Sequence, residues 1–142
     1  MGASLLEVKD RVQRYLSEII GTVQIDKEGD YNFRQNSTHV FISVYELNET
    51  NFGVNVFAQT NFQVPPSPEL FKYVATNNGY RFGRLCATEK DDGVLISFSH
   101  NLLGDFLDLE ELRWAVGAVA VTADEIDDEI KNKFGGRLVY EE

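Results

Sequence analysis

The chain has 142 residues, of which 43% are apolar and 25% charged, a composition typical of one folded domain rather than a disordered chain. Its net charge of −10 argues against nucleic acid and against an anionic membrane surface as partners. No apolar run reaches the ~18–20 residues needed to cross a bilayer, and residues 1–6 lack the features of a signal peptide. These observations predict a cytoplasmic protein that binds neither membranes nor nucleic acid.

The N-terminal half predicts one helix followed by β-strands. Apolar residues recur at three- and four-residue spacing over residues 5–20, with Ser4 as a cap and Gly21 as the end of the helix. Four β-rich runs follow, separated by turn-forming residues: 22–26, 31–34, 38–47 and 52–64. Pro65 and Pro66 end the last run, because proline cannot donate to a strand ladder.

The next segment predicts a short helix and a hairpin. Ser67 is a favourable N-cap and Pro68 is tolerated at the first helical position, so a second helix is expected from there to Asn77. Two further β-rich runs follow, at 80–88 and 94–100. The acidic turn between them ends in Gly93, and this pattern favours a β-hairpin.

The last helix completes the fold. Asp108 and Glu111 resemble a capping box, and the helix is expected to run to Phe134, where two glycines end it. The resulting order is α-β-β-β(-β)-α-β-β-α, an α+β fold with an antiparallel sheet of about five strands and three helices. We assign residues 1–136 to one domain and 137–142 to a C-terminal tail.

Alternation gives the predicted sheet two faces. In the runs 38–47 and 52–64 one parity carries mainly valine, isoleucine and alanine, whereas the other combines polar residues with Phe41, Tyr45 and Phe57. Either the second helix covers these three aromatic side chains, or they form an exposed patch of the kind that marks a partner site. We take Phe41, Tyr45 and Phe57 as candidate contacts for a protein or peptide partner.

The last helix carries two apolar stripes. One is a seam at four- and three-residue spacing that predicts packing along the whole helix: Leu112, Val116, Val119, Ala123, Ile126 and Ile130. The other, Trp114, Ala118 and Val121, lies on roughly the opposite side. Either the other helices of the chain cover this second stripe or a second copy of the chain does, and we take its residues as a candidate self-association surface.

No pattern of catalytic or metal-binding residues is present in the sequence. His39 and His100 have no further ligands at metal-site spacing, and Cys86 lies within a predicted strand, where a small buried hydrophobe is expected. Consecutive acids at 124–129 point in different directions on a helix, so we interpret them as a solvated face rather than a cation site. The sequence predicts no enzyme, no metal and no cofactor.

Several short segments together resemble a known family. They are Asp-Leu-Glu-Glu-Leu-Arg at 108–113, Ala-Asp-Glu-Ile-Asp-Asp-Glu-Ile at 123–130 and Lys-Phe-Gly-Gly at 133–136, with Asn77-Asn78 before Phe82-Gly83-Arg84 and the Asp91-Asp92-Gly93 turn. Their order and spacing are similar to the YbjN-like domain family and, beyond it, to the type III secretion chaperone fold. The resemblance implies a small acidic cytoplasmic protein, often dimeric, that holds a segment of a client protein, and it carries over no catalytic residue.

Three functions are compatible with these observations. The first is a non-enzymatic, chaperone-like or regulatory domain that holds a client segment on an apolar sheet surface. The second is a small-molecule-sensing regulatory domain with a pocket between sheet and helices. The third is a hydrolase, which requires a pair of carboxylates facing one cleft. We favour the first.

Overall fold

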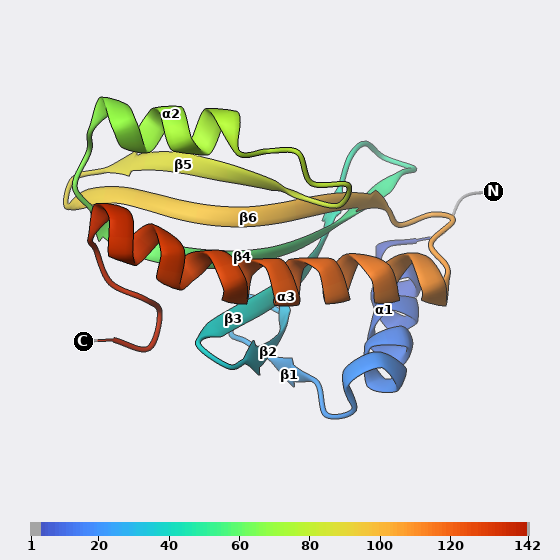
Figure 1. The fold of residues 1–142 in the computed structure, drawn as a ribbon. Coiled ribbons are helices and arrows are strands. Elements are labelled where there is room, and N and C mark those ends of the chain that lie inside the picture. The colour runs from blue at the N-terminus through green and yellow to red at the C-terminus, as the bar shows by residue number, and fades with distance from the viewer. Residues whose placement is uncertain (1–3, 142) are drawn as a thin grey trace.

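The computed structural model describes residues 4–141 as a six-stranded antiparallel sheet with three helices (Figure 1). The helices are α1 (Leu5–Ile20), α2 (Pro68–Thr76) and α3 (Leu109–Phe134). The strands are β1 (Gln24–Ile25), β2 (Tyr31–Gln35), β3 (Thr38–Glu46), β4 (Phe52–Val64), β5 (Arg84–Lys90) and β6 (Gly93–Leu103), in the spatial order β1-β2-β3-β4-β6-β5. The α+β class and the element order are confirmed, and the predicted strand count is low by one.

The three helices begin where the sequence predicts. Each cap side chain accepts a hydrogen bond from the backbone N–H three residues later: Ser4 from Glu7 (3.2 Å), Ser67 from Leu70 (3.1 Å) and Asp108 from Glu111 (2.8 Å). These bonds satisfy donors that have no partner within the helix. Within residues 4–141, none of the helices is both long and apolar enough to span a membrane, and residues 1–3 of the N-terminal stretch lie outside the described part.

The β5–β6 hairpin differs from the prediction at both ends. β5 begins at Arg84 rather than at residue 80, and β6 continues past His100 to Leu103. Gly83 explains the late start, because its φ of +91° suits glycine and its N–H donates to Nδ1 of His100 at 3.0 Å instead of joining the ladder. A Cβ atom at this position would lie 2.4 Å from the Phe98 ring, so the backbone passes closely over that ring.

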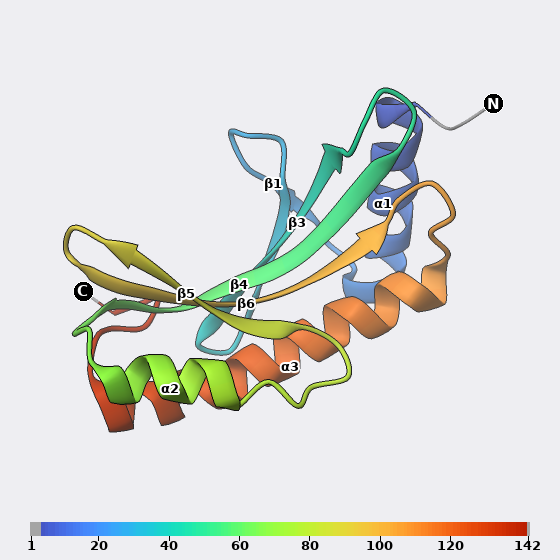
Figure 2. The ribbon, with the colours of Figure 1, turned by 90° about the horizontal axis from the view of Figure 1, so that it is seen from above.

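The helices lie on one face of the sheet (Figure 2). The sheet contributes side chains without any exposure to the core between them: Val40, Ile42, Val54, Val56, Ala58, Ile96 and Phe98. These side chains fill space between sheet and helices, where the second hypothesis places a small-molecule pocket. On the helical side, α2 packs beside α3, with the rings of Tyr73 and Phe134 5.4 Å apart. The interpretation that α2 covers Phe41, Tyr45 and Phe57 is therefore wrong, because α2 lies on the opposite face.

Two carboxylates of α3 hold the β2–β3 turn. Asp124 accepts hydrogen bonds from Ser37 N–H (3.2 Å), Ser37 O–H (2.9 Å) and Asn36 Nδ2 (2.9 Å). Asp127 is fully buried; its Oδ2 lies 2.7 Å from Ser37 Oγ, and its Oδ1 has no partner among the described residues. The interpretation of residues 124–129 as a solvated face is therefore wrong for Asp127. Because Asp127 is enclosed, it does not face a cleft as the hydrolase hypothesis requires.

The environment shifts the pKa of these two acids in opposite directions. Burial raises the pKa of Asp127, and this effect outweighs the hydrogen bonds from Ser37 and from the Asp128 backbone. Burial also acts to raise the pKa of Asp124, but its hydrogen bonds from Asn36 and Ser37 are stronger and lower the pKa. A protonated Asp127 can donate to Ser37 Oγ while the Ser37 hydroxyl donates to Asp124, so each of these two short contacts has one donor and one acceptor.

Candidate binding site

The face of the sheet opposite the helices carries a stacked aromatic pair. Phe41 of β3 and Phe57 of β4 are direct partners in the antiparallel ladder, and their rings lie 5.4 Å apart at an interplanar angle of 18°. Both side chains are partly buried, so they are neither enclosed in the core nor free in solvent. The His39 ring lies 4.9 Å from Phe41 and extends this row along β3. We call Phe41, Phe57 and His39 the aromatic row.

Tyr45 shares this face but lies apart from the aromatic row. Its ring rests on Gly53, where a Cβ atom would lie only 2.4 Å away, and its hydroxyl donates to Asn101 Oδ1 at 2.8 Å. A polar row separates it from Phe41, consisting of the paired residues Ser43, Asn55 and Asn101. The structure thus brings Phe41 and Phe57 into contact and places Tyr45 beyond polar neighbours on the same face.

Sequence reasoning missed Leu103 and His39 on this face and the exposed Phe106 elsewhere. Leu103 pairs opposite Gly53, next to Tyr45, and is 59% exposed. Its alternation with the inward residues of β6 identifies it only when the strand extends past His100, where the predicted strand ends. Phe106, at 83% exposure, lies in the loop before α3, where no periodic pattern could have predicted its orientation. His39 has the parity of Phe41 in the sequence, but the contact between the rings depends on the folded geometry.

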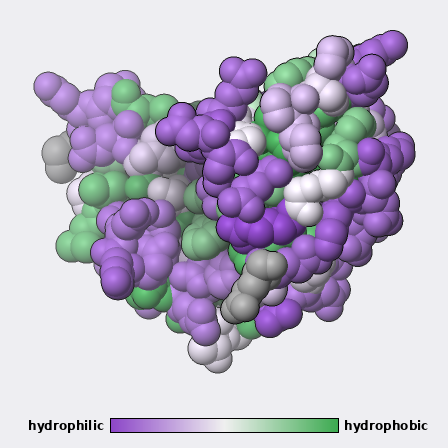
Figure 3. All heavy atoms as spheres, turned by 90° about the vertical axis from the view of Figure 1, so that its left-hand side faces the viewer, coloured by the Kyte–Doolittle hydropathy of each residue, from purple (hydrophilic) through white to green (hydrophobic). Residues whose placement is uncertain are grey.

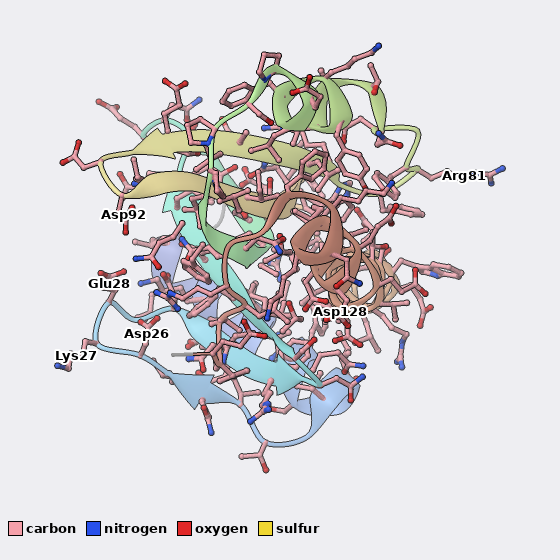
Figure 4. All side chains as sticks on the ribbon, turned by 60° about the vertical axis from the view of Figure 1, so that its left-hand side comes forward. Asp26, Lys27, Glu28, Arg81, Asp92 and Asp128 are labelled. Atoms are coloured by element: carbon pink, nitrogen blue, oxygen red, sulfur yellow. The ribbon has the colours of Figure 1, made fainter. Side chains whose placement is uncertain are left out.

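Charged turns frame this face at both ends of the strand order. In Figure 4, Asp26, Lys27 and Glu28 extend from the β1–β2 turn and Asp92 extends from the β5–β6 turn, whereas Asp128 lies on α3. Figure 3 shows the adjoining end of the molecule, where apolar areas are separated by broad hydrophilic ones. The aromatic row is therefore a limited apolar area on a sheet whose end turns carry charged side chains.

Histidine 39 is held between two hydrogen-bonding groups. Its Nε2 lies 2.8 Å from Asn32 Oδ1, an acceptor, so Nε2 donates, and Nδ1 is left to accept from the hydroxyl of Tyr140. Burial and the nearby Arg34 cation lower the pKa of His39. The ring is therefore neutral at pH 7 and keeps the tautomer that these two bonds require.

The second predicted surface lies on the solvent side of α3. Trp114 and Val121 are 62% and 52% exposed, and Ala118 is partly buried between them. With Phe82, Arg113 and Gly117 they line a shallow hollow of about 450 Å³, in which the rings of Phe82 and Trp114 stack at 6.2 Å. The alternative that other helices cover this stripe is wrong, since Trp114 and Val121 are open to solvent.

Known structures share this fold at low sequence identity. The Yersinia pestis type III secretion chaperone SycH, solved in complex with a stable fragment of YscM2, matches with a TM-score of 0.56 and 8% identity, over 83% of this chain and 98% of that chain. The ExsC–ExsE complex matches with a TM-score of 0.61 and 18% identity, over 84% and 93%. YbjN, a putative transcription regulator from E. coli, matches with a TM-score of 0.59 and 15% identity, over 89% and 93%.

The family assignment rests on the sequence itself. No curated protein matches the chain. A family model described as T3SS (YopN, CesT) and YbjN peptide-binding chaperone 1 matches residues 7–142, which is nearly the whole chain. This match agrees with the shared fold and with the resemblance noted in the last helix. The chain therefore belongs to the family of T3SS (YopN, CesT) and YbjN peptide-binding chaperones.

Proposed function

We propose that this protein is a non-enzymatic chaperone that holds a segment of a client polypeptide on the outer face of its sheet, with Phe41, Phe57 and Tyr45 as contacts. The observation that carries the proposal is the stacked Phe41–Phe57 pair on a sheet face that none of the three helices covers. Aromatic side chains of this kind supply a large contact area at low entropic cost. The SycH and ExsC structures, which share the fold, each contain a second protein.

The surrounding charge supports the same function. A net charge of −10 opposes non-specific aggregation, so it keeps the protein soluble while an apolar area is open. The same charge disfavours nucleic acid and anionic lipid as ligands, which leaves polypeptide as the proposed client. The proposal also places this binding in the cytoplasm.

The Phe57→Asp variant tests the client face. It places a carboxylate against the Phe41 ring of the aromatic row, so clients recovered from the native extract are expected to fall by about tenfold or more, since an aromatic contact that anchors an interface is typically worth about 2 kcal/mol or above. Pull-down with quantitative mass spectrometry measures the recovery.

Ala75→Asp is the matched control, because Ala75 is an exposed residue on α2, on the other face of the sheet. This variant should recover the same clients as the unaltered chain. Equal recovery by Phe57→Asp and Ala75→Asp would show that clients bind elsewhere.

We also propose that α3 joins two copies of the chain through Trp114, Ala118 and Val121. A twofold axis between Gly117 and Ala118 sets Trp114 of one copy against Val121 of the other, which makes the surface self-complementary. A Cβ atom at Gly117 would meet nothing within 4 Å, so another backbone can approach closely there. This antiparallel arrangement also keeps the acidic C-terminal halves of the two helices apart.

Sedimentation equilibrium tests this association. The unaltered chain is expected to approach twice its monomer mass at high micromolar concentration, and Trp114→Glu is expected to remain a monomer, because a buried unpaired carboxylate is costly. Leu6→Glu is the matched control, since Leu6 is 69% exposed on α1, and it should associate like the unaltered chain. A monomer mass for the unaltered chain at every concentration contradicts the proposal.

A further inference from the structure

The C-terminal segment, residues 137–141, packs against the sheet after α3 ends. In Figure 1 the chain leaves α3 and turns back beside the β2–β3 hairpin. Arg137 pairs with Phe62 of β4 through two backbone hydrogen bonds of 2.8 and 2.9 Å, and Leu138 is only 6% exposed. The base of the segment is therefore anchored to the protein.

Tyr140, near the end of this segment, is held through its side chain and is partly exposed. It is 44% exposed, its ring lies 3.9 Å from the guanidinium carbon of Arg34, and its hydroxyl donates to His39. Arg34 and His39 are direct partners in the β2–β3 ladder, so they form the two sides of one slot. On the far side of Tyr140 the segment is anchored again, because Glu141 binds Lys131, Arg137 and the Leu138 N–H. The contacts of the Tyr140 side chain itself are few and solvent-accessible, so its ring can rotate out of the slot while the backbone of the segment stays in place.

The slot is continuous with the aromatic row. The ring of His39 contacts Tyr140 on one side, with centroids 5.9 Å apart, and Phe41 on the other, at 4.9 Å. A polypeptide lying along Phe57 and Phe41 therefore reaches the position that Tyr140 occupies. The Arg34 guanidinium has its Nε bonded to the Asn36 carbonyl at 2.7 Å, which fixes its plane over the ring.

We propose that Arg34 and His39 form a subsite for an aromatic side chain, which Tyr140 fills in the unbound protein and an aromatic residue of the client fills in the complex. The inference rests on the proposed client face and adds the chemistry of the client: a segment with an aromatic residue where it passes the start of β3. Tyr140 thereby acts as a built-in competitor that selects for such segments.

Fluorescence anisotropy with the full chain tests the subsite. The probe is a labelled strand-forming peptide of alternating threonine and valine with one central tyrosine, and the matched peptide carries alanine in its place. Tyr140→Ala is expected to bind the tyrosine peptide about fivefold more tightly than the unaltered chain, as the release of one exposed cation–π contact predicts. The alanine peptide should bind both chains equally, and adding Arg34→Ala should remove the gain.

Two further variants separate the outcomes. Tyr140→Phe keeps a ring in the slot and should bind the tyrosine peptide like the unaltered chain. Equal affinity of Tyr140→Ala and the unaltered chain, with binding still weakened by Phe57→Asp, overturns the subsite and leaves the proposed function intact. Two results overturn the client face and the subsite with it. One is that neither peptide binds any of the chains, and the other is that Phe57→Asp leaves peptide binding unchanged.

Discussion

Replacement of Phe98 by alanine is expected to lower the free energy of unfolding by about 3–5 kcal/mol, the usual cost of removing a buried phenyl ring. Phe98 is the largest side chain without exposure, and it contacts the Tyr80 ring edge-on at 5.1 Å. Phe57→Ala, one position away in the β4–β6 ladder, should cost only about 1 kcal/mol, since a partly exposed aromatic pair contributes little more.

Urea unfolding of both variants measures this difference. The two phenylalanines differ mainly in the face of the sheet they occupy, so each is the matched control of the other. Phe98→Ala should lose most of the stability of the protein, and Phe57→Ala should keep a two-state transition close to that of the unaltered chain. Equal costs for the two variants would mean that Phe57 belongs to a core and that the outer face is not available to a client.

Asp127→Asn is expected to stabilise the protein by about 1–3 kcal/mol at neutral pH, because it removes a buried charge with an unpartnered oxygen. The amide Nδ2 can donate to Ser37 Oγ in place of the protonated acid, while Ser37 still donates to Asp124. The pKa of Asp127 is raised in the folded state, so its contribution to stability is fully present below the unfolded pKa and is lost as pH rises through the folded pKa. The advantage of the variant should therefore grow with pH.

Unfolding measured between about pH 4 and pH 8 isolates this contribution as the difference between the variant and the unaltered chain. Glu125→Gln serves as the control, since Glu125 is exposed on the same helix, and this variant should change the free energy of unfolding by no more than about 0.5 kcal/mol. An Asp127→Asn variant that is less stable than the unaltered chain at pH 8 contradicts this account of the buried carboxylate.

Much of the fold follows from local signals in the sequence. The caps at Ser4, Ser67 and Asp108 fix the helix starts, because a side-chain acceptor three residues before a free N–H has the same effect in any context. Alternation along β3 and β4 separates the buried valines from Phe41 and Phe57, because successive side chains of a strand point to opposite faces of the sheet. The outward position of Trp114 on α3 follows in the same way from helical spacing.

Other features depend on contacts between distant segments. Asp127 is buried because the β2–β3 turn lies on it, and an acid within an acidic run gives no sign of this. Gly83 delays β5 because the Phe98 ring lies beneath it. The contact of Tyr140 with Arg34 and His39 joins residues about a hundred positions apart, and the short tail has no periodicity that could reveal it. The end of the domain, placed at residue 136, stays a prediction.

The two proposed surfaces lie on different sides of the molecule. The aromatic row is on the sheet face away from the helices, and the Trp114 stripe is on the solvent side of α3. Two copies joined through α3 can therefore each present a free client face. This arrangement allows one dimer to hold two segments of a client, which increases the apparent affinity without any new contact.

Photo-crosslinking is the most direct test of where the client binds. Benzoylphenylalanine is placed at position 57 in one chain and at position 114 in another, and each is irradiated with the clients recovered by pull-down. The account predicts that position 57 crosslinks to client and position 114 crosslinks to a second copy of the chain. Crosslinks to client from position 114, with none from position 57, would contradict it.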